Sequence, residues 1–120
     1  MNIKEVQQIL GAEFIGGYQD ENLVFDVAFA SDLMSDVLAY IKENCLFLSG
    51  LTNEQTVRTA ALVDINAIVF VRNKRPGENV VKLANDNKIT LLTTKCTMYL
   101  ACGKLYAAGL PGYSIESNTV

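Results

Sequence analysis

The sequence predicts an α/β protein of three layers: a mostly parallel sheet of about five strands with helices on both faces. From Val24 onward, strand-like and helix-like segments alternate with short connections, as in βαβ units. Residues 67–71, Ala-Ile-Val-Phe-Val, would be apolar on both faces of a strand, which is typical of a central strand covered on both sides. The length of 120 residues, half of them apolar, suits one compact domain.

The first third of the chain is expected to hold one helix and two strands. Apolar residues spaced three and four apart predict a helix over residues 2–10 that ends at Gly11. Residues 12–15 predict a short strand broken by Gly16-Gly17. Residues 24–30 predict a further strand, in which Asp26 places one face or an edge in water.

The second third is expected to contain two helices around a buried strand. Ser31-Asp32 has the features of a helix start, because a hydroxyl can cap free amides and an acid suits the first turn. The apolar stripe of that helix comprises Leu33, Val37, Leu38 and Ile41. Residues 46–48 predict a strand ending at Ser49-Gly50, and residues 52–55 fit a capping box in which Thr52 is the cap.

The last third continues the alternation. After the strand at 67–71 comes a basic turn, and Pro76 fits the first position of the next helix. Residues 89–92 predict a buried strand, and Thr93 or Thr94 is expected to cap a final helix over residues 95–108. Together these elements predict a single domain over residues 1–112, followed by a mobile tail at 113–120.

Several function classes are disfavoured by composition. The chain has no histidine, which removes serine–histidine and cysteine–histidine catalysis, so we expect no enzyme activity. Three cysteines without C-x-x-C spacing and without histidine do not suit a zinc or iron–sulfur site, and we expect no cofactor. Cys45, Cys96 and Cys102 are interpreted as reduced, buried thiols of a cytoplasmic protein, because no export signal or membrane span is evident.

Charge is unevenly distributed along the chain. Residues 1–57 carry nine acidic and two basic groups, whereas residues 58–120 carry four acidic and eight basic groups. A dipolar surface favours self-complementary contacts and a small anion on the basic side, although chance unevenness explains it as well. The basic residues are scattered without interleaved aromatic residues, so we expect no nucleic-acid partner.

A ligand site would lie beyond the carboxyl ends of the parallel strands. The topology brings hydroxyls, helix starts and four basic side chains to that edge, which together suit a phosphate or nucleotide. The candidate residues are Ser31, Ser49, Gly50, Thr52, Arg72, Lys74, Arg75, Thr93, Thr94 and Lys95. Helix caps and solvated turns are the alternative explanation, and neither standard phosphate-binding loop motif is present.

Two further features bear on chemistry and assembly. Asp32 and Asp36, four residues apart, could share a helix face and bind Mg²⁺, but an acid in a first turn needs no such role. Between Met98 and Ala108 only Gly103 and Lys104 are not apolar, and a helix of this kind must be covered on more than one face. We therefore expect a homodimer, in which Leu100 and Leu105 face different sides.

The stretch from Ala30 to Leu105 resembles the DRTGG domain family. The similarity lies in Ala-Ser-Asp-Leu-Met-Ser-Asp-Val-Leu at residues 30–38, in Ala-Ile-Val-Phe-Val followed by a loop and Pro76, and in residues 89–98. The sequence departs from the family motif at two turns. Gly50-Leu51-Thr52 stands where an acid–arginine pair would follow glycine, and Val71-Arg72-Asn73-Lys74 replaces the threonine–glycine–glycine turn.

The resemblance implies a fold similar to the amino-terminal domain of HPr kinase/phosphorylase. It also implies a regulatory, self-associating module of the kind that accompanies phosphate acetyltransferases and CBS-domain pyrophosphatases, or a small protein associated with iron-only hydrogenase systems. Two hypotheses follow, beside a third, enzymatic alternative that would rest on Asp32, Asp36 and Lys95. The chain is a non-catalytic module that senses a nucleotide or another phosphate-bearing metabolite, or it is a ligand-free accessory protein that docks on a larger enzyme of a hydrogenase or kinase system.

Overall fold

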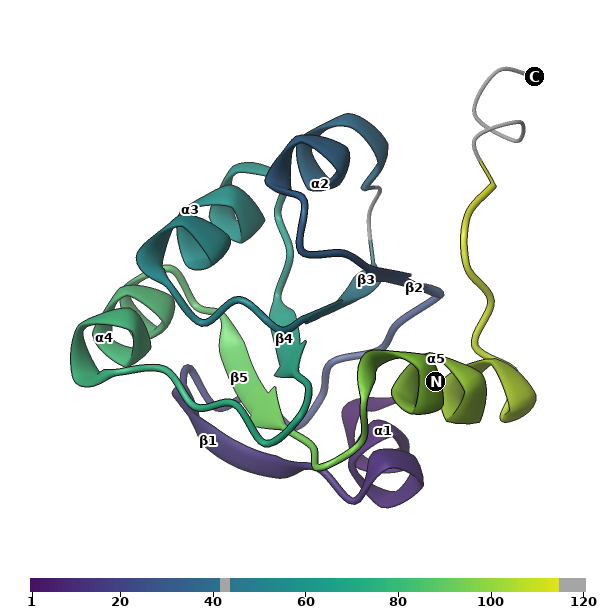
Figure 1. Cartoon of the computed structure of the whole chain (residues 1–120). Coiled ribbons are helices and arrows are strands. Elements are labelled where there is room, and N and C mark those ends of the chain that lie inside the picture. Colours follow the sequence, from purple (N-terminus) through teal and green to yellow (C-terminus); the bar gives the residue numbers. More distant parts are fainter. Residues whose placement is uncertain (42–43, 115–120) are drawn as a thin grey trace.

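The computed structural model describes residues 1–41 and 44–114, which form five strands and five helices. Figure 1 shows the sheet in the middle of the molecule with helices on both sides, as the sequence predicted. The elements in chain order are α1 (Ile3–Leu10), β1 (Glu13–Gly17), β2 (Val27–Ala30), α2 (Met34–Tyr40), β3 (Cys45–Ser49), α3 (Glu54–Leu62), β4 (Ala67–Phe70), α4 (Glu78–Asp86), β5 (Thr90–Thr93) and α5 (Met98–Ala107).

The sheet is mixed but mostly parallel. Its strand order is β1-β5-β4-β3-β2, in which β2, β3, β4 and β5 run parallel and β1 pairs antiparallel with β5. The two edge strands are therefore β1 and β2. The parallel strands follow one another in sequence order, each connected to the next by one helix, so the α/β alternation predicted from Val24 onward is confirmed.

Alternate side chains of the central strands pack into two separate hydrophobic cores, one on each face of the sheet. Val69 of β4 and Leu48 of β3 point to the side covered by α1 and α5. Ile68 and Phe47 point to the opposite side, which is covered by α2, α3 and α4. All four side chains are fully buried. The strict alternation explains why β4 and the first four residues of β3 are apolar, since neither face of these strands meets water.

The first helix ends as predicted, but the strands around it differ from expectation. Asn2 and Glu5 form a capping box at the start of α1, and Gly11 adopts the left-handed conformation at its end. Gly16 and Gly17 do not break β1; they lie within it. A Cβ at position 16 would lie 2.6 Å from a methyl carbon of Val81, so glycine lets α4 approach the strand closely.

The second predicted strand is shorter than its apolar run. β2 begins at Val27 because the preceding residues pair with the amino terminus instead. The backbone amide of Phe25 donates to the Met1 carbonyl at 2.8 Å, and the Met1 ammonium group donates back to the Phe25 carbonyl at 3.0 Å.

Several predicted helix starts were wrong by a few residues. α2 begins at Met34, not at Ser31-Asp32, and Leu33 and Leu38 are exposed whereas Val37 is buried. Asn53, not Thr52, caps α3 by accepting a hydrogen bond from the Thr56 amide at 3.0 Å. Pro76 lies before α4, which begins after Gly77, and Thr97 caps α5 in place of Thr93 or Thr94.

The remaining sequence predictions have mixed outcomes. Cys45 and Cys96 are buried free thiols, but Cys102 is partly exposed, because it lies on a side of α5 that the sheet does not cover fully. The predicted mobile tail falls largely on residues 115–120, outside the described part of the chain. No helix among the described residues is long and apolar enough to cross a bilayer.

Candidate functional site

The carboxyl ends of β4 and β5 form the point at which chain connections diverge. β4 leads into α4 on one face of the sheet, whereas its neighbour β5 leads into α5 on the other face (Figure 1). In open α/β sheets, ligands bind beyond the carboxyl ends of strands at such a divergence. The two loops involved, residues 71–77 and 94–97, contain five of the ten residues predicted from the sequence.

These two loops are joined by backbone hydrogen bonds. The amide of Arg72 donates to the Cys96 carbonyl and the amide of Asn73 donates to the Thr94 carbonyl, both at 2.8 Å. Arg72 and Asn73 both have left-handed backbone conformations, with φ of 59° and 57°. This conformation is uncommon outside glycine, so the turn after β4 is held in an unusual shape by its neighbours. The two loops are therefore joined through their backbones, and the side chains of Arg72, Lys74, Arg75 and Lys95 are exposed.

A second group of residues forms around Asp32. The Asp32 carboxylate accepts hydrogen bonds from the Ser49 hydroxyl at 2.9 Å and from the Gly50 amide at 2.7 Å. The Arg72 guanidinium lies over Gly50, so closely that a Cβ at position 50 would be 2.5 Å from its terminal nitrogen. The structure therefore brings together Ser49, Gly50 and Arg72, as predicted, with a carboxylate already bound at the turn.

Two of the three threonines of the predicted site, Thr93 and Thr94, face the protein interior. The Thr93 hydroxyl donates to the carbonyls of Lys74 at 2.8 Å and Phe70 at 3.2 Å. The Thr94 hydroxyl donates to the Leu10 carbonyl at 2.7 Å, and both side chains are buried. Their hydroxyl protons are thus engaged in joining the loops to the rest of the fold.

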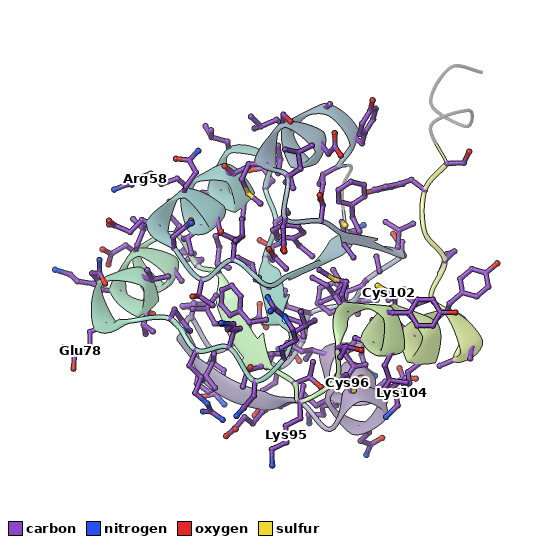
Figure 2. All side chains as sticks on the ribbon, viewed as in Figure 1. Arg58, Glu78, Lys95, Cys96, Cys102 and Lys104 are labelled. Carbon is purple, nitrogen blue, oxygen red and sulfur yellow. The ribbon has the colours of Figure 1, made fainter. Side chains whose placement is uncertain are left out.

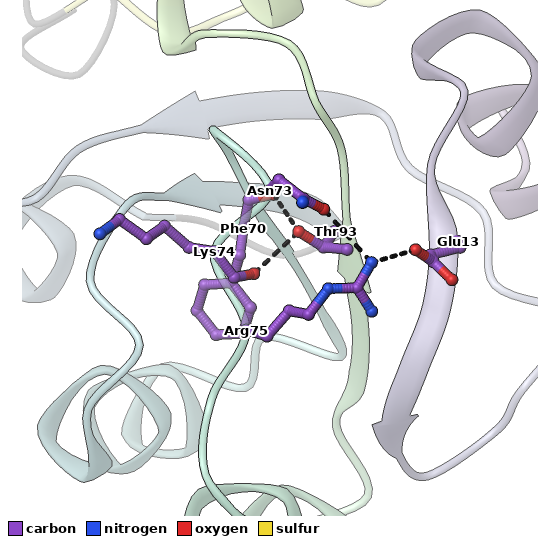
Figure 3. A network of polar contacts seen from close by, with 6 residues as sticks. All are labelled: Glu13, Phe70, Asn73, Lys74, Arg75 and Thr93. Carbon is purple, nitrogen blue, oxygen red and sulfur yellow. Dashed lines mark hydrogen bonds and ion pairs between the residues drawn. The ribbon is translucent and has the colours of Figure 1, made fainter.

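The basic residues of the turn differ in their partners. Figure 3 shows the Arg75 guanidinium reaching Glu13 of β1, with which it forms an ion pair, and the Asn73 side chain. Lys74 extends in the opposite direction, and Figure 2 shows Lys95 pointing away from the molecule. Within residues 1–41 and 44–114, Arg75 is neutralised by an acid, whereas no ion pair involves Arg72, Lys74 or Lys95.

The two remaining predicted residues lie at the margin of this site. The Ser31 hydroxyl accepts from the Leu33 amide at 2.9 Å, and the Ser31 amide donates to the Leu48 carbonyl. Thr52 is half-buried next to Asn53, the cap of α3. From the sequence, Asp32 was expected to be an acid in the first turn of a helix, where it could also pair with Asp36. That pairing on one helix face was wrong, since Asp32 precedes α2 and its carboxylate turns to β3.

Sequence reasoning missed an apolar groove between α5 and the edge strand β2. The groove has a volume of about 340 Å³. The residues that line it are Ala28, Ala30, Tyr99, Cys102, Gly103, Leu105, Tyr106, Leu110, Pro111 and Gly112, and we call this surface the α5–β2 groove. Figure 2 shows Cys102 on α5. Partial burial raises the pKa of this thiol, so it is neutral and weakly nucleophilic. The apolar composition of α5 was the only signal of the groove in the sequence.

Comparisons with known proteins agree with the resemblance read from the sequence. The model of the DRTGG domain matches residues 5–106. A crystal structure of the CBS and DRTGG domains of the regulatory region of Clostridium perfringens pyrophosphatase, complexed with the activator diadenosine tetraphosphate, has a similar fold, with a TM-score of 0.74 at 15% sequence identity. The similarity covers 92% of this chain and 47% of that chain, so this chain spans about half its length. No curated protein matches the sequence.

Proposed function

This chain belongs to the DRTGG domain family, and from that premise we propose that it is a non-catalytic regulatory module that responds to a phosphate-bearing metabolite such as a nucleotide. The similar clostridial structure is described as part of a regulatory region bound to a nucleotide activator, which supports a regulatory role for a domain of this fold. The absence of histidine from the sequence further disfavours acid–base catalysis near neutral pH.

The observation that carries the ligand proposal is the set of basic side chains at the carboxyl edge. Arg72, Lys74 and Lys95 extend from two loops that are hydrogen-bonded to each other, and none of the three forms an ion pair with an acid among the described residues. Arginine and lysine side chains bind phosphate groups, because charge-assisted hydrogen bonds are about twice as strong as neutral ones. The Ser49 hydroxyl and the Gly50 amide beside Arg72 donate hydrogen bonds to the Asp32 carboxylate, which supports the proposal that donors at this turn suit an oxyanion.

Thermal melting against a panel of nucleotides and inorganic phosphates tests this proposal. A ligand at a hundred times its dissociation constant should stabilise the protein by about 2.7 kcal/mol, which is several degrees for a domain of this size. Replacing Arg72, Lys74 and Lys95 together by glutamine should abolish the shift. The matched control replaces Lys4 of α1, Lys82 of α4 and Lys88 of the turn after α4, three exposed lysines outside the two loops, and should retain the shift. Equal loss in both variants would contradict a local site.

The second candidate function is a ligand-free accessory protein that docks on a larger enzyme. The exposed apolar side chains of α5, which are Tyr99, Leu100 and Tyr106, favour it. A flat melting panel, with no ligand shifting the transition by more than a degree, would favour this candidate over the metabolite sensor.

A further inference from the structure

One face of α5 carries two exposed tyrosines on either side of a glycine. Tyr99, Gly103 and Tyr106 are four and three residues apart, so they lie on the same side of the helix. Tyr99 is 90% exposed and Tyr106 is 74% exposed. All three residues line the α5–β2 groove. Large aromatic side chains of this kind are enriched at protein interfaces.

The glycine in the middle of α5 has no explanation within its own subunit. A Cβ at position 103 would meet no atom within 4 Å, so no neighbouring element requires the absence of a side chain there. The helix does not need glycine either, since glycine is among the poorest residues for a helix interior. Gly103 instead leaves a notch between two projecting rings, and a bulky side chain from another molecule can occupy such a notch.

The chemistry of the groove suits a copy of the same surface. None of its lining residues is charged, and small residues form one wall, Ala28 and Ala30 of β2. A twofold interface must be self-complementary, because each surface meets its own copy. Projecting tyrosines beside a hollow of small residues satisfy this requirement. The two exposed rings contribute about 300 Å² per subunit, more than a third of the roughly 800 Å² per partner in a standard interface.

We propose that the α5–β2 groove is the homodimer interface of this protein, with Tyr106 of each subunit packing against the groove of the other near Gly103. The sequence analysis based the expected homodimer on the apolar surface of the last helix, and this proposal adds the groove beside that helix as the contact. The proposal is independent of the metabolite proposal, because the basic loops at residues 72–75 and 94–96 contribute none of the lining residues.

Light scattering and analytical centrifugation of the full chain test the interface. The parent should be a dimer of twice its 13.1 kDa mass at micromolar concentration. Tyr106→Glu should dissociate it, weakening association at least a hundredfold while the protein stays folded. The matched control is Leu62→Glu on α3, because Leu62 is also 74% exposed but lies on the other side of the sheet. This variant should dimerise like the parent.

Two further measurements test the same interface if Tyr106→Glu folds poorly. Gly103→Gln fills the notch without adding charge and should also weaken the dimer at least tenfold, with a melting temperature no lower than that of the parent at equal monomer concentration. Cys102 should react with a maleimide at least tenfold more slowly in the parent than in a monomeric variant. A parent that stays monomeric at high micromolar concentration overturns the proposal, as does a Leu62→Glu variant that dissociates as readily as Tyr106→Glu.

Discussion

Asp32 is the residue whose role depends most on tertiary structure. In the sequence it has the features of a first-turn acid, but its carboxylate instead accepts hydrogen bonds from Ser49 and Gly50, 17 and 18 residues away. The same holds for Thr94, whose hydroxyl donates to Leu10, 84 residues earlier. Local sequence patterns predict which side chains reach the carboxyl edge, because strand ends determine that. They do not predict which of these groups are already engaged, because the partners are distant in sequence.

Val69 tests the centre of the fold at a single residue. It is fully buried in β4 and packs in the core beneath α1 and α5. Val69→Asp would bury an unpaired carboxylate, costing several kcal/mol of the roughly 5–15 kcal/mol that stabilise a domain. We expect no cooperative melting transition. Val24→Asp, at an exposed position, is the control and should melt near the parent temperature; cooperative melting of both variants would show that β4 is not central.

Cys45 gives the protein a defined sensitivity to alkaline pH. Burial raises the pKa of its thiol from 9.0 to about 11, while hydrogen bonds involving Tyr113 and Phe29 lower it by less. The folded state therefore holds the proton more tightly than the unfolded state. This difference adds up to about 3 kcal/mol to the free energy of unfolding. The contribution is present in full below pH 9 and is lost as the pH rises to about 11. Urea unfolding between pH 8 and 11 measures this loss. Cys45→Ala should lack it, and an identical decline in that variant would assign the effect to other groups.

At the scale of elements, the sequence predicts the central strands well and the helix starts poorly. β3 and β4 are apolar on both faces, and burial on both sides leaves no other interpretation. Helix starts are harder, because several residues in a row can cap. Thr93, Thr94 and Thr97 could each cap α5, but only Thr97 does so, since the hydroxyls of the first two donate to the carbonyls of Lys74 and Leu10. Nothing in the local sequence of β1 indicates that it pairs antiparallel with β5.

The two leucines of α5 test how this helix packs. They were predicted to face different sides, and this is confirmed: Leu105 is buried in the core, whereas Leu100 is 48% exposed. Leu105→Glu should unfold the protein by placing a charge in that core. Leu100→Glu should lower the free energy of unfolding by no more than about 0.5 kcal/mol, as surface substitutions usually do. Circular dichroism during urea unfolding measures both, and a reversed order would show that α5 is rotated about its axis.

At the scale of the whole molecule, the fold separates two surfaces with different chemistry. The carboxyl edge of β4 and β5 presents Arg72, Lys74 and Lys95, while the α5–β2 groove is uncharged. A metabolite at the basic edge and a second subunit at the groove can therefore bind at the same time. The loop that carries Lys95 leads directly into α5, so this loop connects the basic edge to the helix that lines the groove.

The location of the ligand site is the central claim, and amide chemical shifts measure it most directly. A ¹⁵N-labelled sample titrated with ATP, and separately with inorganic phosphate, should show saturable shifts at residues 49–52, 72–75 and 94–96. The shifts should weaken with added salt, because exposed charges are screened. Amides at residues 28–30 and 102–112 should move little. An unchanged spectrum at millimolar ligand, or shifts that cluster in the α5–β2 groove instead, would contradict the claim.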